Sequence, residues 1–142
     1  LGSPAAGAVT MADVDVFGQM RPEHVLERIS QAIPHQLGRA HLPLAQYMPE
    51  LAGHLGGATV ELGTTYYRWP RAGERLVLRS ALSDATPKTC RLTHWLLDPA
   101  TGQAWADTEM LIVNFDLNAR AAVALSPEVF AVLAAGITRK AD

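Results

Sequence analysis

Asp15 is a candidate catalytic carboxylate, which could attack a carbonyl group or activate water. It lies in a short loop that contains Gly18, just before a predicted helix that begins at Pro22. A carboxylate can act as a nucleophile or a general base, and the first N–H groups of a helix favour a developing oxyanion. The alternative for Asp15 is structural, because Asp also caps helices and forms Asx turns. The residue types leave both functions open.

Two further carboxylates, Glu23 and Glu27, lie one turn apart on the polar side of the predicted helix. A solvated helix surface is the ordinary place for such residues. Asp13, by contrast, is expected to be a plain loop residue.

Three arginines, Arg68, Arg71 and Arg75, flank a predicted hairpin turn over Pro70–Gly73. A guanidinium group offers paired N–H donors that match a phosphate, so these residues are a candidate phosphate site. The alternative is a solvated end of a hairpin.

The histidines and the cysteine show no pattern typical of a metal site. The five histidines, at positions 24, 35, 41, 54 and 94, include no i,i+4 pair and no HExxH motif, so we expect no zinc. His94 lies in a predicted strand and is expected to be a hydrogen-bonded core or interface residue. His35 and His54 border an irregular segment and can line a pocket. Cys90, the single cysteine, is expected to be buried.

Length and composition indicate one globular domain. The chain has 142 residues, of which 49% are apolar, and its net charge of −2 offers no cationic field for nucleic acid or an anionic membrane. No apolar run approaches the roughly 20 residues that span a bilayer. We expect residues 1–7 to be a flexible start or a remnant of cloning, and residues 8–142 to form the domain.

The first half of the chain contains one strongly amphipathic helix. Apolar residues recur at helical spacing over Pro22–Ile33, and Pro34 is expected to end or kink that helix near Ile33. A short extended segment is expected over Ala8–Ala12. Residues 38–57 are rich in Gly and Pro and indicate an irregular connection, which in a compact domain often forms a lid or a pocket wall.

The residue composition of the second half of the chain predicts a β-sheet. Runs rich in Val, Thr, Leu, Ile and aromatic residues predict strands over Ala58–Trp69, Glu74–Ala85, Lys88–Asp98 and Gln103–Asp116. Because short turns separate them, we expect a four-stranded antiparallel meander. A final helix is expected over Pro127–Ala135, with Ser126 as its cap.

The expected class is therefore α+β, with one long curved antiparallel sheet wrapped around the only helix of matching length. Apolar residues that alternate along the strands should supply the sheet's half of the core: Val60, Leu62 and Tyr66, and Leu76, Leu78 and Leu82. Leu111, Val113 and Phe115 on the last long strand indicate a second buried surface, such as a dimer interface.

The order of these elements resembles the hotdog fold, and three motifs resemble the hydroxybenzoyl-CoA thioesterase-like family. Val14–Met20 is similar to that family's Asp-x-x-Gly-His-Met/Val loop, with Gln19 in place of the usual His. Tyr66–Glu74 is similar to its strand–Pro-x-x-Gly-Asp/Glu–strand hairpin, and Leu96–Gly102 to its later turn. Together the motifs cover most of residues 9–125.

The resemblance implies a thioesterase that hydrolyses acyl-CoA or acyl-carrier-protein thioesters, with Asp15 as nucleophile or general base. Since some hotdog thioesterases carry the catalytic carboxylate on the helix, the resemblance makes Glu23 and Glu27 alternative candidates. With acyl-CoA as the substrate, the phosphates that the three arginines are candidates to bind are those of coenzyme A. Family members often polarise the thioester carbonyl with an N–H at the helix start. Since Pro22 has none, the donor is expected to be the amide of Arg21 or Glu23, or the side chain of Gln19.

The resemblance further implies a homodimer or homotetramer with its site at the subunit interface. We expect a cytoplasmic protein with no cofactor or metal, and no nucleic-acid or membrane partner. Two other functions stay open. Gln19 and Pro22 favour a non-catalytic hotdog domain that binds acyl thioesters or serves as a scaffold. A hydratase or dehydratase would need an Asp–His pair, and spacing alone assigns no carboxylate to His24.

Overall fold

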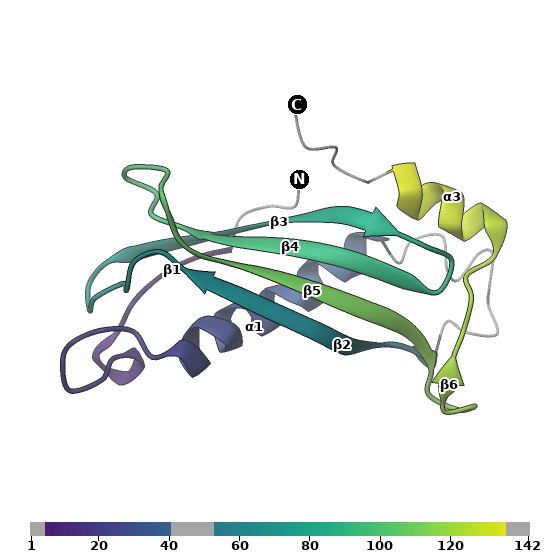
Figure 1. Ribbon diagram of the computed structural model, residues 1–142, viewed down its shortest axis with the longest axis horizontal. Helices are drawn as coiled ribbons and strands as arrows, with labels where there is room; N and C mark the ends of the chain where they lie inside the picture. Colours follow the sequence, from purple (N-terminus) through teal and green to yellow (C-terminus); the bar gives the residue numbers. More distant parts are fainter. Residues whose placement is uncertain (1–4, 41–52, 136–142) are drawn as a thin grey trace. The chain divides into compact units, whose positions relative to one another are not determined.

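The computed structural model describes residues 5–40 and 53–135, and it combines helices with strands as the α+β class requires (Figure 1). Among these residues, no helix is both long enough and apolar enough to cross a membrane. The elements are β1 (Ala5–Ala8), the 3-10 helix η1 (Met11–Asp13), α1 (Pro22–Ala40), β2 (Leu55–Tyr66), β3 (Arg75–Ala85), β4 (Thr89–Leu97), β5 (Ala104–Asp116), β6 (Ala121–Ala122) and α3 (Pro127–Ala135).

The strands form a six-stranded sheet in the order β1-β3-β4-β5-β2, and β6 pairs with β5. The predicted meander is confirmed for β3, β4 and β5, which short turns connect. It is wrong for β2, which lies beside β5 and not beside β3 (Figure 1). The reason is that β3 already has a neighbour on each side, since β1 pairs with it antiparallel and β4 occupies its other edge.

Two predicted boundaries in the first half of the chain are wrong. The first strand lies at Ala5–Ala8, because Thr10 N–H donates to Asp13 Oδ2 (2.8 Å) and closes residues 11–13 into the 3-10 turn. Of the two outcomes expected at Pro34, an end of the helix is wrong, because α1 continues to Ala40. A proline inside a helix removes one main-chain hydrogen bond and can bend the helix without ending it. Residues 41–52 of the expected irregular connection lie outside the described residues.

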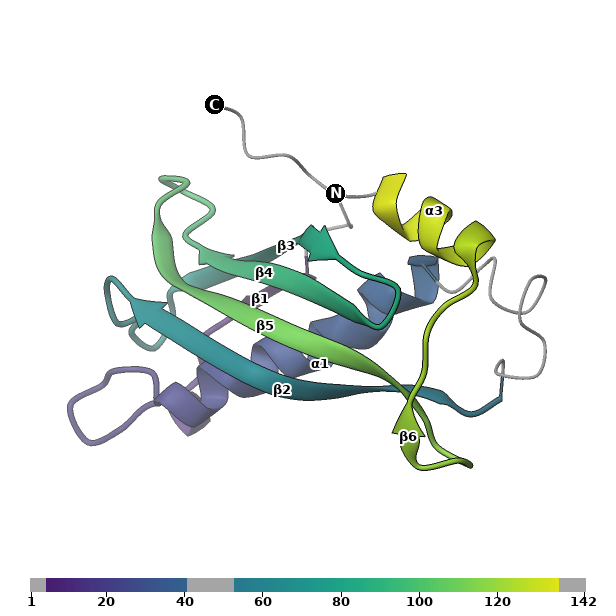
Figure 2. The ribbon, with the colours of Figure 1, turned by 45° about the vertical axis from the view of Figure 1, so that its right-hand side comes forward.

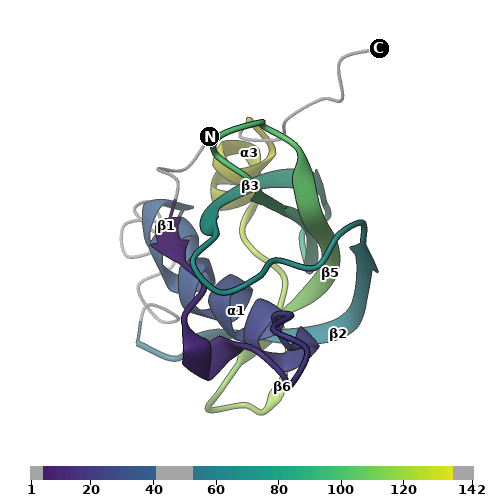
Figure 3. The same ribbon diagram turned by 90° about the vertical axis from the view of Figure 1, so that its left-hand side faces the viewer.

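The chain divides into two compact units, and the first contains residues 1–36, 64–80 and 94–108. In this unit α1 lies against one face of the strands (Figures 2 and 3). Val25 and Ile29 of α1 are each 1% exposed, and Leu76 and Leu78 of β3 are also buried. The predicted packing of the sheet against α1 is therefore confirmed in this unit.

The second unit contains residues 37–63, 81–93 and 109–142. Cys90 is buried there, as predicted. Val60 and Leu62 are 55% and 48% exposed, so their predicted place in the core is wrong. The cause is the position of β2 at the edge of the sheet. The expected single domain over residues 8–142 stays a prediction.

Helix α3 has its own small apolar cluster in the second unit. Its bounds match the prediction, and Ser126 Oγ accepts a hydrogen bond from Val129 N–H (3.4 Å), which confirms the predicted cap. Leu125 and Val129 are buried, and four partly buried apolar residues pack against them: Leu55, Val123, Phe130 and Leu133. Burial of this cluster holds α3 within the unit.

His94 is completely buried in the first unit, as a hydrogen-bonded core residue of the predicted kind. Its Nδ1 lies 2.6 Å from Ser80 Oγ, and its Nε2 has no hydrogen-bond partner in the described part of the chain. Burial penalises the charged imidazole and lowers the pKa of His94 from 6.5 to about 4. The ring is therefore neutral at pH 7.

We expect the free energy of unfolding to fall by up to about 3 kcal/mol as the pH drops from 6.5 to 4. In this window the unfolded chain binds a proton at His94 that the folded chain does not, so acid favours unfolding. Urea unfolding at a series of pH values measures the effect. His94→Gln removes the titrating ring and should flatten the pH dependence, whereas an unchanged slope in the variant would contradict the assignment.

Candidate active site

The loop over Val14–Met20 is a tight hairpin that ends one residue before α1 begins. Val14 and Met20 form an antiparallel bridge and are both buried. Inside the loop, Asp15 N–H donates to Gln19 O (2.9 Å) and Gly18 N–H donates to Asp15 O (3.0 Å). Gly18 has φ +76°, a conformation that glycine adopts at little steric cost. Its buried ends and its glycine therefore give the loop one defined shape.

The Asp15 carboxylate is exposed and held at one oxygen. Its Oδ1 accepts hydrogen bonds from Phe17 N–H (2.8 Å) and Gln19 N–H (3.1 Å), which is the Asx turn left open by the sequence. Its Oδ2 has no hydrogen bond within the described part of the chain. The turn thus orients the carboxylate and leaves its second oxygen available for chemistry.

The start of α1 offers one backbone donor beside this loop. Arg21 N–H is already committed to Asp13 O (2.9 Å), Gln19 N–H donates to Asp15, and Pro22 has no N–H. Glu23 N–H sits in the first turn, where a helix provides no acceptor, and no other described group accepts from it. Of the two backbone amides expected as oxyanion donors, the one of Glu23 is therefore available.

The acidic side chains on α1 are on the surface. The side chain of Glu23 is 65% exposed and that of Glu27 is 59% exposed. Glu23 lies 3.9 Å from an Arg21 guanidinium nitrogen, and Glu27 accepts a hydrogen bond from Gln31 (3.3 Å). The structure therefore places both carboxylates on the solvated face of the helix.

Asp13 is the residue that sequence reasoning missed. It is 7% exposed, and both of its carboxylate oxygens are occupied. Oδ1 lies 3.0 Å from His24 Nδ1, and Oδ2 accepts from Arg28 (2.8 Å) and from the N–H and hydroxyl of Thr10 (2.8 and 3.0 Å). We call these four residues the Asp13 cluster. His24 and Arg28 are four residues apart on α1 and so share a face, which was the available signal.

The Asp13 cluster keeps its carboxyl ionised. Burial raises the pKa of Asp13, but hydrogen bonds from Thr10 and His24 and the charge of Arg28 outweigh burial and lower it from 3.8 to about 2. An Asp–His pair of the kind a hydratase needs is thus present. Because Asp13 is buried with both oxygens engaged, it can orient His24 but cannot itself contact a substrate.

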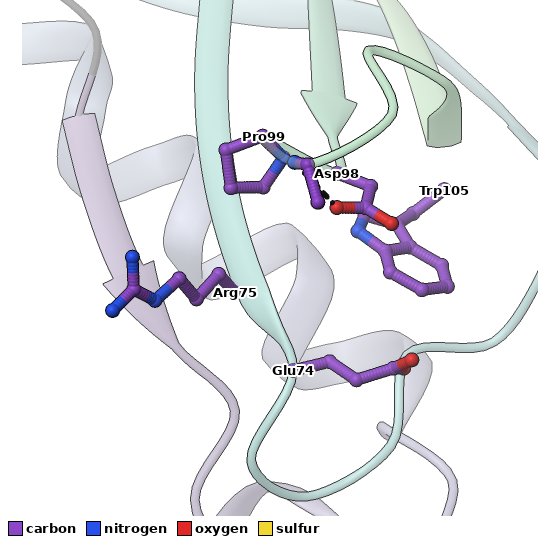
Figure 4. A pocket seen from close by; sticks show the side chains of 6 residues that line it. Glu74, Arg75, Asp98, Pro99 and Trp105 are labelled. Atoms are coloured by element: carbon purple, nitrogen blue, oxygen red, sulfur yellow. Dashed lines mark hydrogen bonds between the residues drawn. The ribbon is translucent and has the colours of Figure 1, made fainter.

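The three arginines take separate places and form no single cluster. Arg71 Nη1 donates to Phe17 O (3.2 Å), so this guanidinium lies on the Asp15 loop. The Arg68 guanidinium stacks over the Trp105 ring, 4.2 Å from its centroid. Arg75 lines a pocket with Trp105 (Figure 4). A role of these residues in phosphate binding stays a prediction.

Of the two histidines expected to line a pocket, His54 has a described side chain, whereas that of His35 lies outside the described part of the chain. His54 Nδ1 lies 2.8 Å from Asp116 Oδ1, an oxygen that also accepts from the amides of Asn118 and Ala119, so His54 belongs to a turn of the second unit. Within residues 5–40 and 53–135, no group of three or more His, Cys, Asp or Glu side chains can hold a metal ion.

A family model described as the thioesterase-like superfamily matches residues 9–133. No curated protein sequence matches the chain. Several solved structures match this chain over most of its length. YbaW from Escherichia coli, described as a probable thioesterase, is 21% identical, with a TM-score of 0.80 over 95% of this chain and 98% of that one. SAV2348 from Staphylococcus aureus, solved in complex with CoA, is 15% identical, with a TM-score of 0.75 over 98% and 87%.

A third match is Slr0204, a 1,4-dihydroxy-2-naphthoyl-CoA thioesterase from Synechocystis. It is 19% identical, with a TM-score of 0.70 over 90% of this chain and 91% of that one. These matches confirm the predicted hotdog fold. The similarity to the hydroxybenzoyl-CoA thioesterase-like family, inferred from the loop and turn motifs, agrees with the matching family model.

We expect Arg28→Met to lower the free energy of unfolding by about 2 to 3 kcal/mol, because it leaves Asp13 buried without its cation. The matched control is Arg91→Met, since Arg91 pairs at 3.8 Å with an exposed Glu61. The control should cost less than about 1 kcal/mol. Urea unfolding at pH 7 compares the two variants, and equal losses would show that the Asp13 cluster contributes nothing special.

Proposed function

The chain belongs to the thioesterase-like superfamily, and on this premise we propose that it hydrolyses acyl-CoA thioesters with Asp15 as the reacting carboxylate. One observation carries the proposal: in the loop that precedes α1, two backbone amides hold Asp15 Oδ1, while Oδ2 has no partner among the described groups. CoA as the carrier is supported by two similar structures, one solved with CoA and one named for an aryl-CoA substrate. An acyl-carrier-protein thioester is the alternative substrate.

In the proposed reaction Asp15 Oδ2 bonds to the thioester carbon, or removes a proton from a water that does so. The carbonyl oxygen then carries the negative charge and accepts a hydrogen bond from Glu23 N–H at the helix start. The C–S bond breaks, and the thiolate leaves and takes up a proton. If Asp15 is the nucleophile, water then hydrolyses the mixed anhydride and restores the carboxylate.

We propose that a second copy of the chain completes this site, in a homodimer or homotetramer. A fully hydrated carboxylate is a poor catalyst, and the Asp15 carboxylate is exposed to solvent. The next two residues in the sequence, Val16 and Phe17, are apolar. Val16 and Phe17 are 94% and 76% exposed, so a partner that covers them would also exclude water from Asp15. The edge strand β2, with its exposed Val60 and Leu62, is a second surface of this kind.

The proposed phosphate contact is Arg71. Its guanidinium lies on the Asp15 loop, through the hydrogen bond to Phe17 O, and so brings positive charge to the reacting carboxylate's own segment. Arg68 is a further candidate, whereas Arg75 shares a pocket wall with Glu74 and Asp98, two carboxylates that disfavour a phosphate beside it. The proposed location is the cytoplasm. A single buried cysteine cannot form a disulfide within the chain, which fits a reducing compartment.

The second candidate function is a non-catalytic hotdog domain that binds acyl thioesters. The observation that favours it is the loss of two donors at the helix start, since Pro22 has no N–H and the Arg21 amide is committed to Asp13. Thiol release from acetyl-, aryl- and long-chain acyl-CoA decides between the two. Hydrolysis supports the enzyme, and binding without thiol release supports the alternative.

We expect Asp15→Asn to lower the turnover of acyl-CoA by at least about 100-fold while leaving the melting temperature within a degree or two. Asparagine keeps an Oδ1 acceptor for Phe17 and Gln19, so the loop should keep its shape. Asp84→Asn makes the same chemical change at an exposed strand position and should leave turnover intact. Full turnover in the Asp15 variant would remove this residue from the mechanism.

We expect Arg71→Glu to raise the KM for acyl-CoA at least about tenfold, because it replaces an attractive charge at the phosphates with a repulsive one. The same variant should leave the KM for an acyl-pantetheine, which lacks those phosphates, nearly unchanged. Steady-state kinetics on both substrates measure the difference. A parallel rise for both would show that Arg71 acts through the Asp15 loop and not through phosphate.

A further inference from the structure

A pocket of about 370 Å³ lies in the first unit, beside the start of β3 and the turn between β4 and β5 (Figure 4). Its walls come from residues that are far apart in the sequence: Glu74, Arg75, Asp98, Pro99, Ala100 and Trp105. No step of the proposed hydrolysis uses this pocket.

Trp105 is the unusual member of the pocket wall. It is 4% exposed, and its Nε1–H has no hydrogen-bond partner among the described residues. A buried donor without an acceptor costs about 1 to 3 kcal/mol, so natural proteins rarely keep one. Asp98 lines the same pocket as Trp105 (Figure 4). An acceptor supplied by a ligand would relieve this cost.

Two anchored carboxylates accompany this donor. Asp98 Oδ1 accepts from Ala100 N–H (2.9 Å), and Glu74 Oε2 accepts from Arg71 N–H (2.7 Å). Each carboxylate is therefore fixed by its own turn through one oxygen, and the described residues donate no hydrogen bond to the other. The residues of the pocket wall thus carry two carboxylate acceptors, the Arg75 cation and, just beneath the surface, one buried N–H donor.

The charged side chains that line the pocket determine which kind of ligand it can bind. Two carboxylates against one guanidinium disfavour an anion such as a phosphate, while Arg75 and the indole N–H disfavour a simple cation. A neutral group with a carbonyl next to an N–H satisfies both kinds of partner at once. We propose that this pocket binds a secondary amide, whose carbonyl accepts from Trp105 Nε1–H and whose N–H donates to Asp98.

The ligand must open the wall slightly, because Nε1 itself has almost no accessible surface. The turn between β4 and β5 is where such movement costs least, since Pro99 and Ala100 are exposed. The amide has two sources. It is either part of the pantetheine arm of a thioester, in which case the inference rests on the proposed function, or part of a free small molecule.

The test is NMR of the tryptophan indole N–H groups, of which the chain has three. Trp105→Phe assigns one resonance to Trp105. The two probes are pantetheine, which carries two amides and a thiol, and N-acetylglycine N-methylamide, which carries amides alone. We expect the Trp105 resonance to move downfield as the probe is added. Asp98→Asn keeps an oxygen for Ala100 N–H but puts a donor where the ligand needs an acceptor, and should weaken binding at least tenfold.

The control is Asp84→Asn, an equivalent change at an exposed site in the second unit, which should leave the titration unchanged. A shift with pantetheine alone identifies the thioester arm as the source, and a shift with the simple amide identifies a free ligand. No shift with either probe, or equal binding in the Asp98 variant, overturns the proposal. The NMR titration measures binding and the thiol-release assay measures hydrolysis, so the two proposals can fail separately. Hydrolysis of acyl-CoA without a shift of the Trp105 resonance refutes only the amide pocket. A shift without hydrolysis refutes only the proposed hydrolase activity.

Discussion

The buried carboxylate of Asp13 ties the segment that precedes the Asp15 loop to helix α1. Thr10 belongs to the start of η1, and His24 and Arg28 belong to the first turns of α1. Arg28 also donates to Ala8 O (3.2 Å) at the end of β1, so one guanidinium holds two segments. Burying a charge is costly unless it is paired and hydrogen-bonded, and here every oxygen has a partner. The loop between these segments takes its position from that pairing.

The position of the loop explains why the structural role of Asp15 does not exclude the chemical role proposed for it. The Asx turn uses Oδ1 alone, so the loop is held by the same residue that presents Oδ2. The Asp13 carboxyl, two residues earlier, is fully engaged and buried. Two acidic residues that are two positions apart therefore have opposite environments, and the difference follows from which one contacts α1. Positioned carboxylates and a helix start are the parts that acyl transfer requires.

Much of the secondary structure follows from short-range patterns. Runs of β-branched and aromatic residues between Pro–Gly turns located β3, β4 and β5 to within a residue or so, and Ser126–Pro127 located the start of α3. Pairing was harder. Tyr66 and Glu74 delimit a connection that reads as a hairpin, yet β2 pairs with β5. Val60 and Leu62 are consequently exposed, because a strand's burial depends on its neighbours as much as on its composition.

Residue order along the chain is sufficient for the α+β class, the Asp-x-x-Gly loop, the helix that follows it and the buried His94 and Cys90, because these depend on neighbours within a few positions. The Asp13 cluster and the Trp105 pocket depend on contacts between distant positions. Asp13 meets partners 11 and 15 residues away, and Trp105 shares its pocket with Glu74. No local pattern encodes those separations. They arise only when the sheet brings the segments together and burial makes each unpaired polar group costly.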